Sequence, residues 1–158
     1  MVQGTVQLEL ATPEETCRFA IGLGTQLVPG DTILLAGSVG SGKTHFSRCL
    51  ILSQMEIAED VPSPTFTLVQ TYETSIGEIW HADLYRLSNF SEIEELGLNQ
   101  AFSDAICLVE WPDRLGGHSP KDALTVSLDA PFGDDRRLAT LIWENPTWEC
   151  KLKKVLND

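Results

Sequence analysis

The sequence is short of positive charge. Its 158 residues include 11 lysines and arginines against 23 aspartates and glutamates, which gives a net charge of −12. A protein this acidic repels the phosphate backbone of nucleic acids over most of its surface. Strong direct binding of DNA or RNA is therefore excluded unless a local basic patch or a partner protein supplies it. The small basic cluster at residues 151–154 is better interpreted as the solvated last turn of a helix.

The sequence also lacks long apolar runs and paired cysteines. The first ten residues, MVQGTVQLEL, contain no basic segment followed by an apolar one, and no apolar run approaches membrane-spanning length. We therefore expect a cytoplasmic protein without membrane contact. Cys17, Cys49, Cys107 and Cys150 form no C-x-x-C pair and have no histidine at metal-ligand spacing. They are expected to be reduced thiols, not a zinc site or a disulfide framework.

Length and hydrophobic periodicity predict one α/β domain over residues 1–158. Strands are expected over residues 6–10, 31–36, 66–72, 78–82, 105–109, 123–128 and 137–143. Helices are expected after Thr12, over 44–55, over 91–96 with Ser91 as N-cap, and at the C-terminus. The short connection at 75–77 predicts an antiparallel hairpin. The expected fold is a three-layer arrangement, similar to phosphate-loop NTPases, around a mixed sheet.

The strongest motif is GSVGSGKT at residues 37–44. It matches the phosphate-loop pattern G-x-x-x-x-G-K-[ST] between an expected strand and an expected helix. Glycines let successive N–H groups face a phosphate, and the helix N-terminus adds its positive dipole end. Lys43 would reach the terminal phosphates, and the Thr44 hydroxyl would ligate Mg²⁺. The expected nucleotide-binding residues of this loop are Gly40, Ser41, Gly42, Lys43, Thr44 and His45.

A phosphate loop also needs an acidic residue at the end of a neighbouring strand to hold Mg²⁺ or its waters. Glu110 ends the apolar run ICLVE, and Asp83 ends the run IWHAD. Because an uninterrupted apolar strand belongs at the centre of a sheet, Glu110 is the expected metal ligand, together with Thr44. Lys43, Asp83 and Glu110 form the expected catalytic set.

A second group of polar residues surrounds the hairpin. Strand alternation places His81 and Asp83 on one face, where they could orient a water molecule or sense the γ-phosphate. Arg86 could stabilise charge in the transition state or pair with an acidic neighbour. Ser63 and Thr65, in a segment with two prolines, are candidate switch residues that would order when the γ-phosphate is present.

Base selection is less visible in the sequence. The guanine-selective N-K-x-D motif is absent, which favours adenine and hence ATP and ADP. Phe132, or the region of Thr12, could contact the base. A turn aromatic and a helix N-cap are at least equally good interpretations of these two residues.

The ordered motifs together resemble the TsaE family, also called YjeE. They are GSVGSGKT at 37–44, SPTF at 63–66, HADLYR at 81–86, ELGL at 95–98 and VEWP at 109–112. The resemblance covers most of the chain. It departs from the usual family pattern at Ser38, where an acidic residue is commoner, and at His45, where threonine or serine is commoner.

This resemblance implies a bacterial Mg²⁺-dependent ATPase that serves the threonylcarbamoyladenosine modification of tRNAs reading codons that begin with A, at adenosine 37. It implies the TsaD and TsaB proteins as partners, slow ATP hydrolysis without them, and only indirect contact with tRNA. By the same resemblance Trp111 would lie beside the nucleotide, Ser63–Phe66 would be a first switch, and Asp83 would be needed for hydrolysis.

Two other functions remain open on the sequence. A small-molecule kinase would use the same phosphate loop, although Arg136-Arg137 is the only adjacent arginine pair available for a lid. An ATP-dependent binding module without significant hydrolysis would use ATP only to order the Ser63–Phe66 segment.

Overall fold

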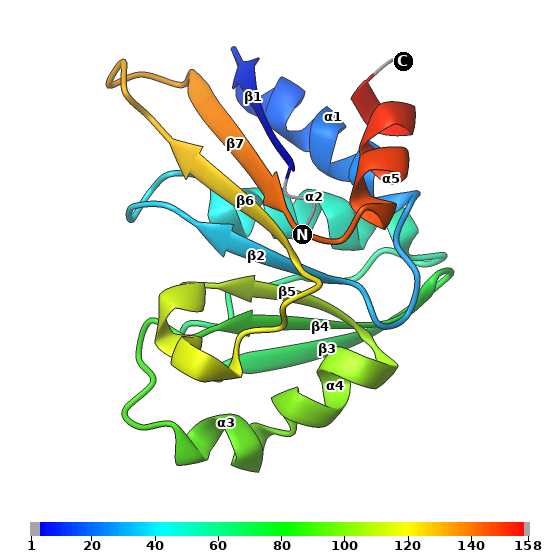
Figure 1. Cartoon of the computed structure of the whole chain (residues 1–158), viewed down its shortest axis with the longest axis vertical. Helices are drawn as coiled ribbons and strands as arrows, with labels where there is room; N and C mark the ends of the chain where they lie inside the picture. Colours follow the sequence, from blue (N-terminus) through cyan, green and yellow to red (C-terminus); the bar gives the residue numbers. More distant parts are fainter. Residues whose placement is uncertain (1–3, 157–158) are drawn as a thin grey trace.

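The computed structural model describes residues 4–156 and builds them around one seven-stranded sheet (Figure 1). The strand order is β1-β7-β6-β2-β5-β4-β3. The strands are β1 (Gly4–Leu10), β2 (Thr32–Ala36), β3 (Val69–Thr74), β4 (Gly77–Asp83), β5 (Ile106–Glu110), β6 (Leu124–Asp129) and β7 (Arg137–Trp143). The helices are α1 (Pro13–Gly24), α2 (Lys43–Gln54), α3 (Ser91–Leu96), α4 (Leu98–Asp104), the 3₁₀ helix η1 (Pro112–His118) and α5 (Thr147–Leu156).

The centre of the sheet is parallel and its edges are antiparallel. Strand β2 pairs in parallel with β5 and with β6, and β4 pairs in parallel with β5. Strands β3, β7 and β1 add antiparallel pairings at the two sides. The predicted mixed sheet and the β3–β4 hairpin are therefore confirmed. The apolar β5 strand lies between β2 and β4, where both of its faces are covered.

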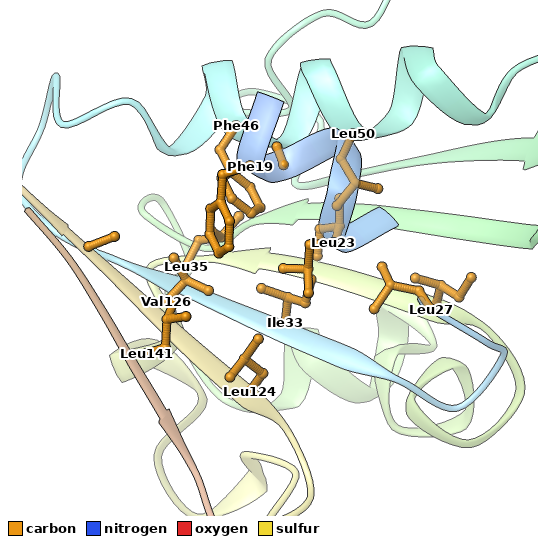
Figure 2. Close-up of a cluster of buried hydrophobic side chains, with 14 of the residues drawn as sticks. Phe19, Leu23, Leu27, Ile33, Leu35, Phe46, Leu50, Leu124, Val126 and Leu141 are labelled. Atoms are coloured by element: carbon orange, nitrogen blue, oxygen red, sulfur yellow. The ribbon is translucent and has the colours of Figure 1, made fainter. Parts of the chain in front are cut away.

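Helices cover both faces of the sheet, which confirms the predicted three-layer α/β architecture. Helices α1, α2 and α5 pack on one face, and α3, α4 and η1 pack on the other. Figure 2 shows the hydrophobic core on the face covered by α1, α2 and α5, where α1 and α2 lie over the central strands. Its labelled side chains are Phe19, Leu23, Leu27, Ile33, Leu35, Phe46, Leu50, Leu124, Val126 and Leu141.

Local sequence signals fix the start of α1 as predicted. Thr12 Oγ1 accepts the Glu15 N–H at 3.1 Å, and Pro13 stands in the first turn. The Glu15 carboxylate accepts the N–H of Ala11 at 2.6 Å, one residue before the N-cap. The start of α3 differs from the prediction. Ser91 is its first residue and not its cap: the N-cap is Phe90, and the Ser91 hydroxyl donates to Asn89 Oδ1.

The expectation that all four cysteines are reduced is wrong for two of them. Cys17 of α1 and Cys49 of α2 form a disulfide, with their Cα atoms 5.4 Å apart. They are 32 residues apart in the chain, and only the side-by-side packing of the two helices brings them together. Cys107 is buried and Cys150 is exposed, both as free thiols. Across residues 4–156 no helix combines the length and apolar character needed to cross a membrane.

Candidate functional site

The phosphate-loop motif forms the connection between β2 and α2. Gly42 is the N-cap of α2 and has a φ of 104°, in the left-handed region that favours glycine. Gly37 has a φ of 134°, and a Cβ atom there would collide with the carbonyl oxygen of Leu128. These two positions therefore require glycine for the loop to turn tightly from the strand into the helix.

Lys43 lies across the inside of this loop. Its ammonium donates to the carbonyl oxygens of Gly37 at 2.7 Å and Ser38 at 2.8 Å. It also stands 4.2 Å from the centre of the Trp111 ring, a cation–π contact. Burial lowers the pKa of Lys43, an effect that the negative charges of Glu110, Asp83 and Asp113 partly oppose. An anionic phosphate placed here would favour the charged ammonium.

Thr44 and Glu110 meet at the ends of α2 and β5. Thr44 Oγ1 donates to Glu110 Oε1 at 2.8 Å. The parallel register that pairs Leu35 with Glu110 brings the end of β5 beside the phosphate loop, as the central position of β5 predicted. The second Glu110 oxygen, Oε2, lies 2.6 Å from Nε2 of His81. Both carboxylate oxygens are thus engaged by side chains from other elements.

Asp83 is next to Glu110 in the sheet and has different contacts. The β4–β5 register pairs the two residues directly. Asp83 Oδ2 accepts the Thr65 hydroxyl at 3.1 Å, and Oδ1 accepts the N–H of Tyr85 at 3.0 Å. Ser63 Oγ lies 2.7 Å from Thr65 Oγ1, so both predicted switch residues connect to Asp83 through one hydroxyl. His81 shares the face of Asp83, as predicted, although its hydrogen bond is to Glu110.

Trp111 follows Glu110 in an unusual conformation. It has a φ of 60°, a left-handed value that is uncommon for a bulky residue and that persists only when its surroundings hold it. Its ring packs against Tyr85, with the ring centres 4.9 Å apart. The local turn therefore directs the indole back over Lys43, beside the place where phosphates would bind.

These residues surround a cleft of about 410 Å³. Its lining residues are Val39, Gly40, Gly42, Lys43, Thr44, His45, Thr65, Asp83, Tyr85, Glu110 and Trp111.

Several predicted site residues do not line the cleft. His81 reaches it only through Glu110, and the Arg86 guanidinium lies 4.5 Å from the centre of the Phe66 ring. Ser41 belongs to the phosphate loop but is buried and does not face the cleft. Ser63 reaches the cleft only through Thr65. Thr12 caps α1, and Phe132 lies exposed with its ring 4.0 Å from the Arg136 guanidinium. The proposed base contacts of Thr12 and Phe132 stay predictions.

Arg137 is a site residue that the motifs do not reveal. From β7, its Nε donates to the Ser41 carbonyl at 2.8 Å and its terminal nitrogen to the Gly40 carbonyl at 3.4 Å. It thereby braces the outer side of the phosphate loop. The sequence offers no signal for this contact, because 96 residues separate Arg137 from Ser41. Arg136 is tied to Asp134 at 3.0 Å.

The donor set of the cleft fits a magnesium–nucleotide complex. Hydroxyl and carboxylate oxygens are the ligands that Mg²⁺ prefers, and it is usually bound through one or two carboxylates plus substrate phosphates. Thr44 and Glu110 supply such a pair. Within residues 4–156 no group of three or more His, Cys, Asp or Glu side chains is placed to hold a metal ion. The residues present would therefore hold the cation only in combination with phosphate oxygens.

Comparison with known proteins gives consistent matches. The family model "Threonylcarbamoyl adenosine biosynthesis protein TsaE" matches residues 10–138. A tRNA threonylcarbamoyladenosine biosynthesis protein TsaE from Rickettsia bellii is 39% identical over 135 residues, covering 85% of this chain and 93% of that protein. The protein of the same name from Bacillus subtilis is 35% identical over 127 residues, covering 80% and 78%. The crystal structure of YdiB from Bacillus subtilis superposes with a TM-score of 0.82 at 25% identity, covering 99% of this chain and 97% of that one.

Proposed function

Because this chain belongs to the TsaE family, we propose that it is a Mg²⁺-dependent ATPase that acts as a switch subunit in tRNA threonylcarbamoyladenosine biosynthesis. The observation that carries the proposal is the contact between the phosphate loop and the neighbouring strand. Thr44, at the start of α2, and Glu110, at the end of β5, are joined at 2.8 Å beside the Lys43 ammonium. Phosphate-loop NTPases require this set of groups at this place.

Lys43 would bind the terminal phosphates. Its present acceptors, the carbonyl oxygens of Gly37 and Ser38, lie in the same loop, so a short movement of the flexible side chain would exchange them for phosphate oxygens. An anionic phosphate adds a direct charge attraction that the neutral carbonyl acceptors lack, which favours that exchange. Arg137 holds the loop carbonyls from the other side and would keep the loop in shape while Lys43 moves.

Thr44 and Glu110 would hold Mg²⁺, which when bound supplies positive charge to the phosphate oxygens. Asp83 would orient the attacking water. In this state, however, Asp83 already accepts hydrogen bonds from Thr65 and from the Tyr85 backbone. Both Glu110 oxygens are also engaged. We infer that the chain alone hydrolyses ATP slowly, because Asp83 or Glu110 must first give up one of these hydrogen bonds.

This requirement supports a role for partner proteins. The segment that carries Ser63 and Thr65 is anchored at Val61, whose carbonyl accepts Arg48 Nε at 2.9 Å, and at Leu68, which pairs with Pro64 and Asp83. Thr65 between these anchors touches Asp83 through its hydroxyl alone. A partner that shifts this segment would free Asp83. By family resemblance the partners are TsaD and TsaB, with tRNA reached only through the complex.

The arginine contacts weigh against the kinase alternative. A small-molecule kinase needs cations that close over the transferred phosphate. Arg137 is bound to the carbonyls of the phosphate loop, so it is not free to form such a lid, and Arg136 is engaged in an exposed ion pair with Asp134. The hydrogen bonds already made by Asp83 and Glu110 are also compatible with a binding module that hydrolyses no ATP. A measurement of ATP turnover distinguishes that module from an ATPase.

One experiment tests the proposal against both alternatives. ATP turnover is measured for the chain alone, with TsaD and TsaB, and with added small-molecule acceptors, at saturating Mg²⁺. We expect slow turnover alone and clear stimulation by the two proteins. If TsaD and TsaB do not increase ATP turnover under any nucleotide condition, the binding module is favoured. Phosphoryl transfer that depends on an added acceptor would establish the kinase.

A further inference from the structure

His81 is a buried histidine with one polar contact. It lies on β4, is fully buried, and shares its face of the sheet with apolar neighbours such as Ile79 and Leu108. Its Nε2 is 2.6 Å from Glu110 Oε2, whereas its Nδ1 makes no hydrogen bond to any described residue. Burying a polar ring in an apolar layer costs free energy unless its hydrogen bonds offset that cost. The contact with Glu110 is the only compensation that the described residues provide.

The geometry assigns the proton of this contact. A carboxylate can only accept, so His81 Nε2 carries the hydrogen and donates it to Oε2. Nδ1 has no partner among the described residues, so the Nε2 contact alone orients the ring. The described contacts therefore favour the ring orientation in which Nε2 of His81 faces Glu110.

The two Glu110 oxygens consequently have different tasks. Oε2 is occupied by His81 from within the sheet, and Oε1 is left toward Thr44 and the cleft. Glutamate has one more rotatable bond than aspartate, so its carboxylate is less well fixed by the backbone alone. A hydrogen bond from a buried ring supplies that fixation. Groups that orient a metal ligand in this way typically change metal affinity by about 10- to 100-fold.

We propose that His81 is a positioning residue: it holds Glu110 Oε2 so that Oε1 faces the Mg²⁺ of the bound nucleotide. This inference rests on the proposed function, since it assumes that Glu110 serves the metal. It differs from a purely structural role for His81, which would affect folding but not the response of nucleotide binding to Mg²⁺.

The test compares two neutral amides of different length. His81→Gln places an amide N–H near the position of Nε2, within reach of Glu110. His81→Asn is one methylene shorter and cannot reach. ADP affinity is measured by calorimetry over a series of Mg²⁺ concentrations, and thermal unfolding confirms that each variant is folded. His118→Gln is the matched control, because His118 is exposed at the end of η1.

For His81→Asn we expect the Mg²⁺ concentration giving half of the affinity gain to rise by about 10-fold or more. His81→Gln should stay within about 3-fold of the wild type, while ADP affinity without Mg²⁺ stays unchanged in both. If His81→Asn unfolds, His81→Gln and His81→Leu provide the same contrast between a donor and no donor.

Equal Mg²⁺ responses in folded wild type, His81→Asn and His81→Gln would overturn the positioning role and leave the proposed function intact. A wild-type chain whose ADP binding ignores Mg²⁺ would instead overturn the metal part of the proposed function, and the positioning role with it.

Discussion

The floor and the rim of the cleft are built differently. The floor consists of Lys43, Asp83 and Glu110, which are 5%, 4% and 2% exposed. The rim includes Val39 and Tyr85, which are 75% and 46% exposed, and the half-buried Thr65. Asp83 and Glu110 end strands, so sheet register fixes them, and Lys43 begins α2 directly after the phosphate loop. Rim residues lie in connections and make side-chain contacts, such as that of the Tyr85 ring with the Trp111 ring, whose centres are 4.9 Å apart.

This difference separates binding from control. A site whose backbone is fixed in advance can bind phosphate and metal through side-chain movements alone, such as the exchange of acceptors by Lys43. An apolar rim in connections is a surface that a bound partner could cover and move. We therefore expect changes in the floor to impair nucleotide binding, its Mg²⁺ dependence or hydrolysis, and changes in the rim to alter the response to partners.

Lys43→Ala should have the largest effect. It removes the one cation of the floor, and its loss deletes charge-assisted hydrogen bonds to the terminal phosphates. We expect ADP and ATP affinity to fall by about 100-fold or more, measured by calorimetry. Lys153→Ala, on the exposed side of α5, is the matched control and should bind as wild type. Near-normal affinity of Lys43→Ala would contradict a floor that binds phosphate.

Much of the floor can be predicted from sequence, because local rules determine it. The glycine spacing and the strand–loop–helix order place Lys43 and Thr44, and the uninterrupted apolar run places Glu110 beside them. The partner of His81 cannot be predicted in this way. Strand alternation puts His81 and Asp83 on one face, but only the register of β4 against β5 decides that His81 meets Glu110.

Contacts between distant elements are also hidden from the sequence. The Arg137 brace and the Cys17–Cys49 bridge join residues separated by 96 and 32 positions. Neither has a local spacing pattern, since each depends on how whole elements pack. The Ser91 cap failed for a more local reason: its hydroxyl donates to Asn89 Oδ1 and caps no N–H of the first turn.

Substitutions of the two acids of the floor, Glu110 and Asp83, should have the next largest effects, and the two effects should differ. Glu110→Gln should raise the Mg²⁺ concentration needed for ATP turnover by about 10-fold or more, because it weakens a metal ligand. Asp83→Asn should lower turnover by about 100-fold while the Mg²⁺ response of ADP binding stays normal, because it removes a group that acts on water. Turnover assays and calorimetry over a Mg²⁺ series distinguish them. The opposite pattern would exchange the two roles.

Thr65→Val tests the connection between rim and floor. It removes the hydroxyl that donates to Asp83 while keeping the shape of the side chain. A hydrogen bond to a charged group contributes about 1.5–3 kcal/mol, so we expect about a 10-fold or larger change in turnover stimulated by TsaD and TsaB, with ADP affinity unchanged. Thr67→Val is the control, because its hydroxyl accepts only from Gln70 at 3.0 Å. Equal stimulation of both variants would remove Thr65 from the switch.

The disulfide should have the smallest effect on the cleft. It joins α1 to α2, the helix that carries Lys43 and Thr44, across 32 residues of chain. Closing a loop of this length stabilises the folded state by about 3–4 kcal/mol in the chain-entropy description. Reduction should therefore lower Tm by about 10 °C. Because sheet register fixes the floor, ADP affinity should stay within about 2-fold.

Thiol labelling establishes first that the bridge is present. In the folded, unreduced protein at pH 8, an alkylating reagent should modify Cys150 alone. Cys17 and Cys49 are bonded, and burial raises the pKa of Cys107 to about 12, so that its thiol is neither ionised nor accessible. Cys17→Ser should then match the reduced wild type in Tm, and Cys150→Ser should match the oxidised one. A large loss of ADP affinity on reduction would show that the α1–α2 cross-link, and not the sheet, holds the floor in place.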